Sequence, residues 1–207
     1  MIEVGIIEPV EESKWASPTV VQEKKTKGEI KICVDLRKLN DACLHDPFPT
    51  PFTDEVLDNV GGQEAYSFID GFSGYHQIRI VLEGRHKTTF ATEWGSYQYT
   101  VMPFGLKNVP AIFSRVVVTA FKEYIHKFLE VYFDDWTMFG LLKKCVASLR
   151  LMLNTCRQYH IFLNTKKCIF YVPFGIFLGH IVCKQGLMMD PMKISIIVNL
   201  SPPKIVR

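Results

Sequence analysis

Two adjacent aspartates, Asp134 and Asp135, interrupt a largely apolar stretch in the middle of the chain. The residues on either side, 129–133 and 136–139, are mostly β-branched, aromatic or otherwise apolar, which is typical of strands. Aspartate favours tight turns, so the pattern predicts a β-hairpin whose turn holds both aspartates. A short hairpin joins antiparallel strands, and the chain is therefore expected to build an antiparallel sheet.

The remaining pattern alternates strands with helices, but the connections after residue 86 are too short for parallel crossovers. We therefore expect an α+β fold, an antiparallel sheet with helices packed on one face. The elements expected in chain order are a hairpin over 20–34, a proline-containing connector over 46–53, a helix from Thr53, a strand over 65–70, a strand pair over 88–101, helices over 110–129 and 142–160, short strands near 169–170 and 181–182, and a helix starting at Asp190.

Charge is unevenly distributed along the 207 residues. Residues 1–140 hold 14 Lys and Arg against 20 Asp and Glu, whereas residues 141–207 hold 10 basic residues and one acid. A basic segment of this kind indicates a polyanion partner such as nucleic acid, although a solvated surface explains it equally well. The six cysteines have no CxxC spacing, and neither a signal peptide nor a long apolar run is present, so we expect a reducing, intracellular location and no membrane contact.

Asp70 ends a second apolar strand, over residues 65–70. If this strand neighbours the hairpin, the carboxylates of Asp70 and Asp134 converge. The basic residues nearest to the two adjacent aspartates in sequence are Lys127 and Lys143, so cationic partners are not close by in the chain. Converging carboxylates either share a proton or hold divalent cations, and hard oxygen ligands favour Mg²⁺. The alternative is an ordinary polar hairpin turn.

Five segments form an ordered set along the chain: residues 32–40, 68–78, 102–108 with 110–113, 132–135 (Tyr-Phe-Asp-Asp), and 178–181 with 186–194. In this order they resemble the fingers motif, the first catalytic motif, the MPFGL…PAxF motif, the YxDD box and the segment that closes the palm in the reverse transcriptases of gypsy-type LTR retrotransposons. They also follow the spacing of that family, from about residue 5 to residue 203.

The resemblance implies the fingers and palm of a right-handed polymerase, an RNA-directed DNA polymerase core. Residues 1–52 are expected to form an N-terminally truncated part of the fingers. Residues 53–207 are expected to form the palm with part of the fingers, about 79–105, and the start of the palm–thumb connection. Thumb, RNase H, protease and integrase are expected to be absent.

The resemblance also assigns residues to a reaction in which a primer 3′-hydroxyl attacks the α-phosphorus of a deoxynucleoside triphosphate. Asp70 and Asp134 match the metal-binding pair, and Asp135 completes the triad around two Mg²⁺ ions, with Mn²⁺ as a substitute. The residues that match the nucleotide pocket are Lys24, Lys31, Tyr75, Phe104 and Gly105, where Tyr75 excludes the 2′-hydroxyl of ribonucleotides by its bulk. The residues expected to contact primer or template are Phe133, Gln77, Lys166 and Lys167.

The implied partners are an RNA and DNA primer–template, deoxynucleoside triphosphates, and a dimer or polyprotein partner. The expected location is a cytoplasmic particle or the nucleus, without secretion. The main alternative is a catalytically weak or inactive nucleic-acid-binding remnant of a retrotransposon polyprotein. A two-metal nuclease or phosphatase needs only the carboxylates, and it leaves Tyr75 and residues 102–106 unexplained.

Overall fold

The computed structural model describes residues 1–23, 30–49, 51–72 and 74–200, which fold into two compact units. Unit 1 comprises residues 1–49 and 73–116, and unit 2 comprises residues 50–72 and 117–207. The chain thus passes from unit 1 to unit 2 and back before it finishes in unit 2, and the last boundary falls inside helix α4. In the part of the chain that is described, no helix is long and apolar enough to cross a membrane.

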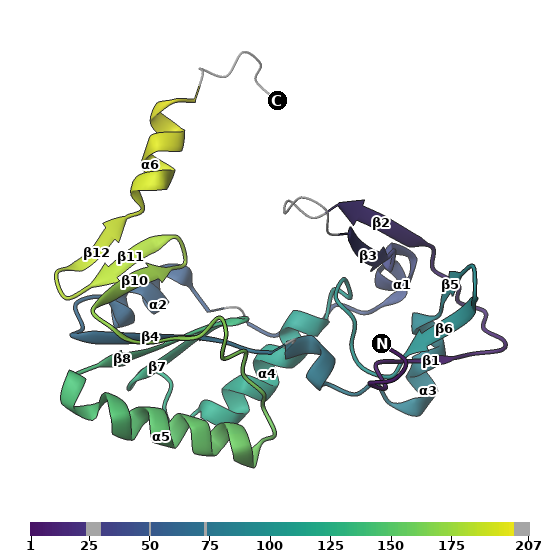
Figure 1. Ribbon diagram of the computed structural model, residues 1–207, viewed down its shortest axis with the longest axis horizontal. Helices are drawn as coiled ribbons and strands as arrows, with labels where there is room; N and C mark the ends of the chain where they lie inside the picture. The colour runs from purple at the N-terminus through teal and green to yellow at the C-terminus, as the bar shows by residue number, and fades with distance from the viewer. Residues whose placement is uncertain (24–29, 50, 73, 201–207) are drawn as a thin grey trace. The chain divides into compact units, whose positions relative to one another are not determined.

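Unit 1 contains two small antiparallel sheets and short helices (Figure 1). One sheet has the order β1-β6-β5, and the other is the hairpin β2-β3. The elements are β1 (Ile7–Pro9), β2 (Thr19–Glu23), β3 (Ile30–Val34), α1 (Arg37–Ala42), the 3₁₀ helices η1 (Gly74–Gln77) and η2 (His86–Thr88), α3 (Leu82–Arg85), β5 (Phe90–Thr92), β6 (Gly95–Tyr99) and the first part of α4 (Val109–Phe121).

Unit 2 is built on a four-stranded antiparallel sheet of order β7-β8-β4-β9, with a second antiparallel sheet of order β10-β11-β12. The elements are α2 (Thr53–Val60), β4 (Ala65–Asp70), the end of α4, β7 (Leu129–Tyr132), β8 (Asp135–Gly140), α5 (Leu142–Gln158), β9 (Ile169–Val172), β10 (Phe174–Phe177), β11 (His180–Cys183), β12 (Gly186–Met189) and α6 (Pro191–Val198).

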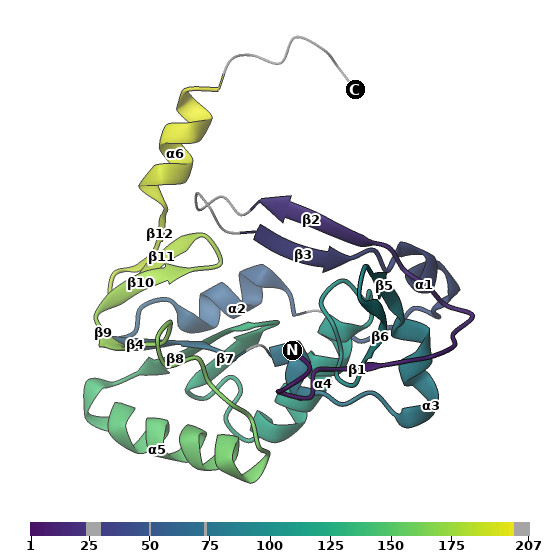
Figure 2. The ribbon, with the colours of Figure 1, turned by 45° about the vertical axis from the view of Figure 1, so that its right-hand side comes forward.

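Alternation along the central strands β4 and β8 sends side chains to opposite faces of the four-stranded sheet. On one face, Tyr66 and Phe139 pack in a buried core with α2 and the β10–β11 hairpin. On the other face, the ring of Trp136 lies 5.5 Å from that of Phe121 in α4. Figures 1 and 2 both place α2 and the second sheet on one side of the four-stranded sheet and α5 on the other. The expected antiparallel α+β fold is confirmed; α4 and α5 share one face, while α2 lies on the opposite one.

Two sequence expectations about element ends need correction. Asp135 is the first residue of β8, so the hairpin loop is Phe133 and Asp134 and not the two aspartates. Helix α4 ends at Phe121 and not near residue 129, because turns at residues 122–124 and 126–128 follow it on either side of the isolated bridge residue Ile125, and His126 adopts a positive φ of 63°. The apolar spacing continues past the helix end because the rings of Tyr124 and Phe128 pack against each other at a tilt, with 5.0 Å between their centroids.

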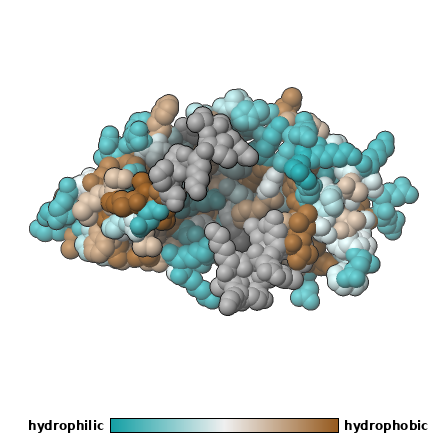
Figure 3. Space-filling model, turned by 90° about the horizontal axis from the view of Figure 1, so that it is seen from above, coloured by the Kyte–Doolittle hydropathy of each residue, from teal (hydrophilic) through white to brown (hydrophobic). Residues whose placement is uncertain are grey.

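The last helix, α6, begins as expected, with the Asp190 side chain accepting a hydrogen bond from the Met192 amide and with Pro191 at the first helical position. Its apolar side chains are exposed, including Met192, Ile197 and Val198. Figure 3 shows hydrophobic side chains gathered over this helix.

Candidate active site

Asp70 and Asp135 face each other at one end of the four-stranded sheet. They are the last register pair between β4 and β8, and directly opposed residues project to the same face of a sheet. Asp135 is also paired with Tyr132 across the hairpin, so β7 ends at the same place. The ends of β4 and β8 that carry the predicted aspartates therefore lie side by side, although a long stretch of chain separates them.

The hairpin loop between β7 and β8 has two residues, Phe133 and Asp134. Phe133 has a φ of 52°, a left-handed conformation that is uncommon for a bulky residue. Its ring packs edge-on against Tyr132, with 5.0 Å between the centroids. Asp134 follows at the exposed tip and is adjacent in sequence to the paired Asp135.

Lys167 places a cation at the carboxylate site, where the sequence predicted none. Its Nζ lies 3.4 Å from Asp70 Oδ2, although the two residues are 97 positions apart. The neighbouring backbone binds the same strand end, because the Asn164 amide donates to the Asp70 carbonyl at 2.8 Å. The absence of a nearby basic residue in sequence therefore did not mean the absence of one in the fold, and Lys167 serves as a partner of Asp70.

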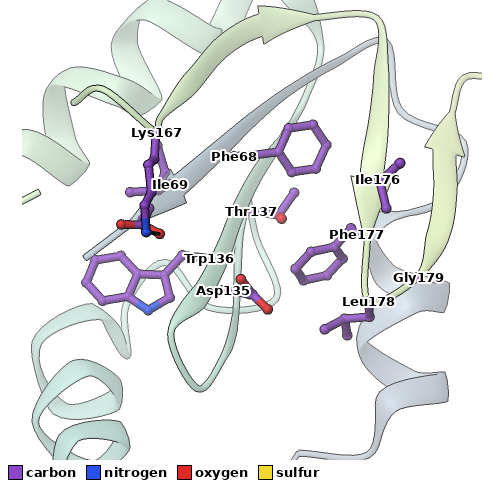
Figure 4. A pocket seen from close by; sticks show the side chains of 11 residues that line it. Phe68, Ile69, Asp135, Trp136, Thr137, Lys167, Ile176, Phe177, Leu178 and Gly179 are labelled. Atoms are coloured by element: carbon purple, nitrogen blue, oxygen red, sulfur yellow. Dashed lines mark hydrogen bonds and ion pairs between the residues drawn. The ribbon is translucent and has the colours of Figure 1, made fainter. Parts of the chain in front are cut away.

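A cavity of about 350 Å³ lies beside these carboxylates, entirely within unit 2 (Figure 4). Asp70, Asp135 and Lys167 lie at its polar side. Figure 4 shows the Asp135 side chain pointing toward the wall made by Phe177 and Leu178. The complete lining is Phe68, Ile69, Asp70, Asp135, Trp136, Thr137, Lys167, Ile176, Phe177, Leu178 and Gly179. The cavity thus places the segment 178–179 of the fifth motif next to the carboxylates.

Partial burial, together with the facing Asp70 carboxylate, raises the pKa of Asp135 above its usual value. Both causes act in the same direction, since desolvation and a like charge each disfavour the ionised form. The carboxylates therefore repel each other, and the Lys167 ammonium offsets only part of their charge. Such a site favours an additional cation.

We expect Asp135→Asn to raise the melting temperature at pH 7. A raised folded-state pKa means that ionised Asp135 destabilises the fold, and this cost disappears as the pH falls below about 4, where the carboxyl is protonated in both states. Because the partly buried Asp135 still has much of its surface in contact with solvent, the gain should be below about 1 kcal/mol, or at most about 4 °C. Thermal melts at pH 7 and pH 4 measure it; an unchanged or lower melting temperature at pH 7 contradicts the repulsion.

The donor chemistry at this strand end fits a hard divalent cation. Carboxylate oxygens are the protein ligands that Mg²⁺ prefers, and it commonly binds through one or two carboxylates plus substrate phosphates. Within the described ranges, no group of three or more His, Cys, Asp or Glu side chains is arranged to hold a metal ion. The structure thus brings Asp70 and Asp135 together without building a complete three-carboxylate cluster, and phosphate oxygens are left to supply further ligands.

The residues expected for the nucleotide pocket lie in unit 1, where an aromatic cluster forms around Tyr75. Its ring lies 4.9 Å from Phe104 and 5.7 Å from Phe113, centroid to centroid. Gly105 adopts a φ of 101°, and its carbonyl accepts a hydrogen bond from the Asn40 side chain at 2.7 Å. Asn40 also accepts from the Lys107 amide at 2.9 Å, so it fixes the conformation of the segment that carries Phe104 and Gly105.

The other residues that were expected to contact the nucleotide or the nucleic acid are distributed over the chain as follows. Lys24 lies outside the described residues, and Lys31 is described only as a backbone position in β3. Gln77 ends η1 and lines a cavity of about 400 Å³ in unit 1. Lys166 is exposed beside Lys167 in unit 2. The resemblance also predicts that Tyr75 lines the nucleotide pocket beside Asp70; Tyr75 belongs to unit 1 and Asp70 to unit 2, and this stays a prediction.

Sequence reasoning missed two polar residues that shape these regions. Asn40 lies in the fingers motif, and its role is given by its two hydrogen bonds to residues 105 and 107. Glu130 lies within the apolar hairpin and is buried, with its Oε1 atom 2.8 Å from His126 Nδ1 and 3.1 Å from Asn59 Nδ2. Burial raises the pKa of Glu130. Its contacts with His126, four residues away, and with Asn59, 71 residues away, explain an acid at this place.

A family model described as reverse transcriptase (RNA-dependent DNA polymerase) matches residues 22–182, which include both strand ends that carry the carboxylates. The chain belongs to the reverse transcriptase family. The Pol polyprotein from transposon 412 of Drosophila melanogaster is 34% identical over 98% of the chain, and that from transposon gypsy is 32% identical over 98%. The enzymatic polyprotein of Cauliflower mosaic virus is 30% identical over 86%.

The reverse transcriptase fold is also found in solved structures similar to this chain. The foamy viral protease–reverse transcriptase in complex with double-stranded DNA matches with a TM-score of 0.88 and 21% identity, over 98% of this chain and 35% of that one. Its complex with an RNA/DNA hybrid matches with a TM-score of 0.84. The chain spans only 17–21% of the length of the Drosophila polyproteins. The gypsy-type resemblance read from the motifs is thereby confirmed.

Proposed function

We propose that this reverse transcriptase chain is the catalytic core of an RNA-directed DNA polymerase. The single observation that supports this most is the register pair Asp70 and Asp135, which brings the first catalytic motif and the Tyr-Phe-Asp-Asp hairpin to one strand end. The substrates are a primer annealed to RNA or DNA and deoxynucleoside triphosphates. No observation favours the alternative of an inactive nucleic-acid-binding remnant.

The proposed reaction is attack of the primer 3′-hydroxyl on the α-phosphorus with release of pyrophosphate. Asp70 and Asp134 are the proposed metal ligands, with Asp135 as the third carboxylate. Two bound Mg²⁺ ions supply positive charge that stabilises the attacking and leaving oxygens. Catalysis of this type consists mainly of positioning and charge neutralisation, which suits a site of carboxylates on rigid strand ends.

The surrounding residues bind and orient the substrates in this proposal. Lys167 balances the charge of Asp70 before substrate arrives and is available to substrate phosphate afterwards. The wall at Leu178 and Gly179 adjoins the carboxylates and limits where the primer end can lie. Phe133 is proposed to contact the primer end. In unit 1, Lys24, Lys31, Tyr75, Phe104 and Gly105 are proposed to hold the nucleotide, and Gln77 to contact the template or primer.

The wider setting is also proposed. All six cysteines are free thiols, which suits a reducing intracellular compartment such as a cytoplasmic particle or the nucleus. The chain covers only 17% and 20% of two of its polyprotein relatives, so we propose that further polyprotein segments or a second copy complete the working enzyme.

A primer-extension assay with the 207-residue chain tests the proposal. Purified protein is given Mg²⁺, the four deoxynucleoside triphosphates and a labelled primer on an RNA template and on a DNA template. Extension that requires Mg²⁺ and disappears in the Asp70→Asn variant supports polymerase activity. Binding of the primer–template without any extension supports the non-catalytic alternative.

We expect nucleic-acid binding to weaken with salt, with Lys166 and not helix α5 contributing to the slope. Helix α5, which carries Lys143 and Arg150, lies on the face of the four-stranded sheet opposite to α2. Lys166, in contrast, directly precedes Lys167, the partner of Asp70. Neutralising one phosphate contributes about −0.9 to the slope of log affinity against log salt. Lys166→Ala should therefore make the slope shallower by about 1, and the matched variant Lys143→Ala should not.

Fluorescence-anisotropy titrations of a primer–template at several salt concentrations measure these slopes. Equal slopes for the wild type and Lys166→Ala, with a shallower slope for Lys143→Ala, contradict this placement of the nucleic acid. Lys167→Ala is less informative, because it also removes the partner of Asp70.

A further inference from the structure

The hairpin loop that carries Asp134 is conformationally demanding. Its first residue, Phe133, has a φ of 52°, whereas Asp134 is not among the described residues with positive φ. In a two-residue hairpin, positive φ at the first position alone is the sign of a type II′ turn, in which glycine is normally found first. A bulky residue in this region is strained, so surrounding contacts must hold it there.

Trp136 supplies such a contact. Its indole Nε1–H donates a hydrogen bond of 3.0 Å to the carbonyl oxygen of Phe133, three residues earlier and on the other side of the loop. The ring itself is fixed, since Trp136 is 1% exposed and lies 5.5 Å from the fully buried Phe121. Its side chain projects away from that of Asp135, as Figure 4 shows. The Trp136 indole is thus a fixed hydrogen-bond donor in the core that holds the carbonyl group of Phe133 in the hairpin loop.

The carbonyl of Phe133 belongs to the peptide plane between Phe133 and Asp134. Types I′ and II′ both have positive φ at the first position and differ in the orientation of this plane, which changes the sign of φ at the second position. Asp134 tolerates either sign, because aspartate enters the left-handed region more readily than most residues. The loop sequence alone therefore does not choose between the two turns, and a hydrogen bond to the Phe133 carbonyl does.

We propose that Trp136 is a positioning residue, whose indole N–H selects the turn type and thereby sets the direction of the Asp134 carboxylate. This inference rests on the proposed function only for the role of Asp134. A purely apolar core position needs no N–H group, and phenylalanine could fill the contact with Phe121. The hydrogen bond is the part of the tryptophan that the loop requires.

The test replaces the Trp136 side chain in the full chain by benzothienylalanine, which has sulfur in place of the indole N–H and nearly the same shape. Trp94 is 79% exposed, so the same replacement there is the matched control. Two properties are measured: the amide resonances of Phe133 and Asp134 in ¹⁵N-labelled protein, and the dissociation constant for Mn²⁺ from the electron paramagnetic resonance of the free ion. Asp70→Asn provides the reference for lost metal binding.

We expect the replacement at position 136 to shift both loop amides and to weaken Mn²⁺ binding about tenfold, as loss of a supporting hydrogen bond does at metal sites. The replacement at position 94 should change neither property. Trp136→Phe should reproduce the effect if the variant folds, as judged by its melting temperature. Unchanged loop amides in the position-136 variant overturn the inference.

The failure of the proposed function has a different signature. Wild-type protein whose Mn²⁺ binding is absent, or is unaffected by Asp70→Asn, contradicts the proposed metal site. The resonances of Phe133 and Asp134 still decide the role of Trp136 in that case, because they report the turn directly.

Discussion

Replacing Asp70 by asparagine should lower the rate of nucleotide incorporation by about 10²–10³-fold or more, the usual cost of losing one group that stabilises charge developing in a transition state. Asparagine preserves the volume and the position at the end of β4, but it removes the negative charge that faces Asp135. Electrostatic stabilisation of this kind usually contributes more to the rate than any other single effect. Single-turnover incorporation on a primed template at saturating Mg²⁺ and nucleotide measures the rate.

Asp58→Asn is the matched control for this change. Asp58 is an exposed acid on α2 in the same unit, so its removal alters the net charge equally without touching the strand end. The control should retain wild-type activity. If Asp70→Asn kept more than a tenth of the wild-type rate, Asp70 would not be a metal ligand, and the site would have to be built around Asp134 and Asp135 alone.

The position of the site within its strands was predictable from the sequence. The strand that ends in Asp70 and the hairpin that contains two aspartates can both be predicted from the rule that short apolar runs of this length form strands. Their meeting at one sheet end followed from the resemblance, because hydrophobic patterns do not say which strands become neighbours. The register that pairs Asp70 with Asp135 then emerged from the packing of both faces of β4 and β8.

The parts that could not be predicted depend on contacts between distant residues. Lys167 pairs with Asp70 across 97 residues, and no local pattern marks it as the partner of that carboxylate. Asp135 belongs to the strand and not to the turn, because the backbone strain is taken up by Phe133, a residue that turn preferences would not select. Composition also gives no indication of which face of the sheet α5 covers, so the basic charge of residues 141–207 does not by itself say which of its lysines lie on a nucleic-acid surface.

Tyr75 is built into unit 1 in a way that suits a fixed steric barrier. It belongs to η1 and is half-buried, with aromatic contacts to Phe104 and Phe113. The adjacent Gly74 approaches Phe113 so closely that a Cβ atom there would lie 2.7 Å from the ring. These contacts restrict the movement of the Tyr75 ring, and a ring that cannot yield excludes an additional hydroxyl group by repulsion.

We therefore expect Tyr75→Ala to reduce the preference for deoxyribonucleotides over ribonucleotides by about 10²-fold, the discrimination typical of a well-packed pocket. Tyr75→Phe keeps the ring and should keep the preference, which separates bulk from the phenolic hydroxyl. The measurement is the ratio of kcat/KM for dCTP and CTP on the same primed template, with Mn²⁺ affinity as the check that Asp70 and Asp134 are undisturbed. An alanine variant that discriminates as strongly as the wild type would show that Tyr75 only packs within its aromatic cluster, and that sugar selection lies with other residues.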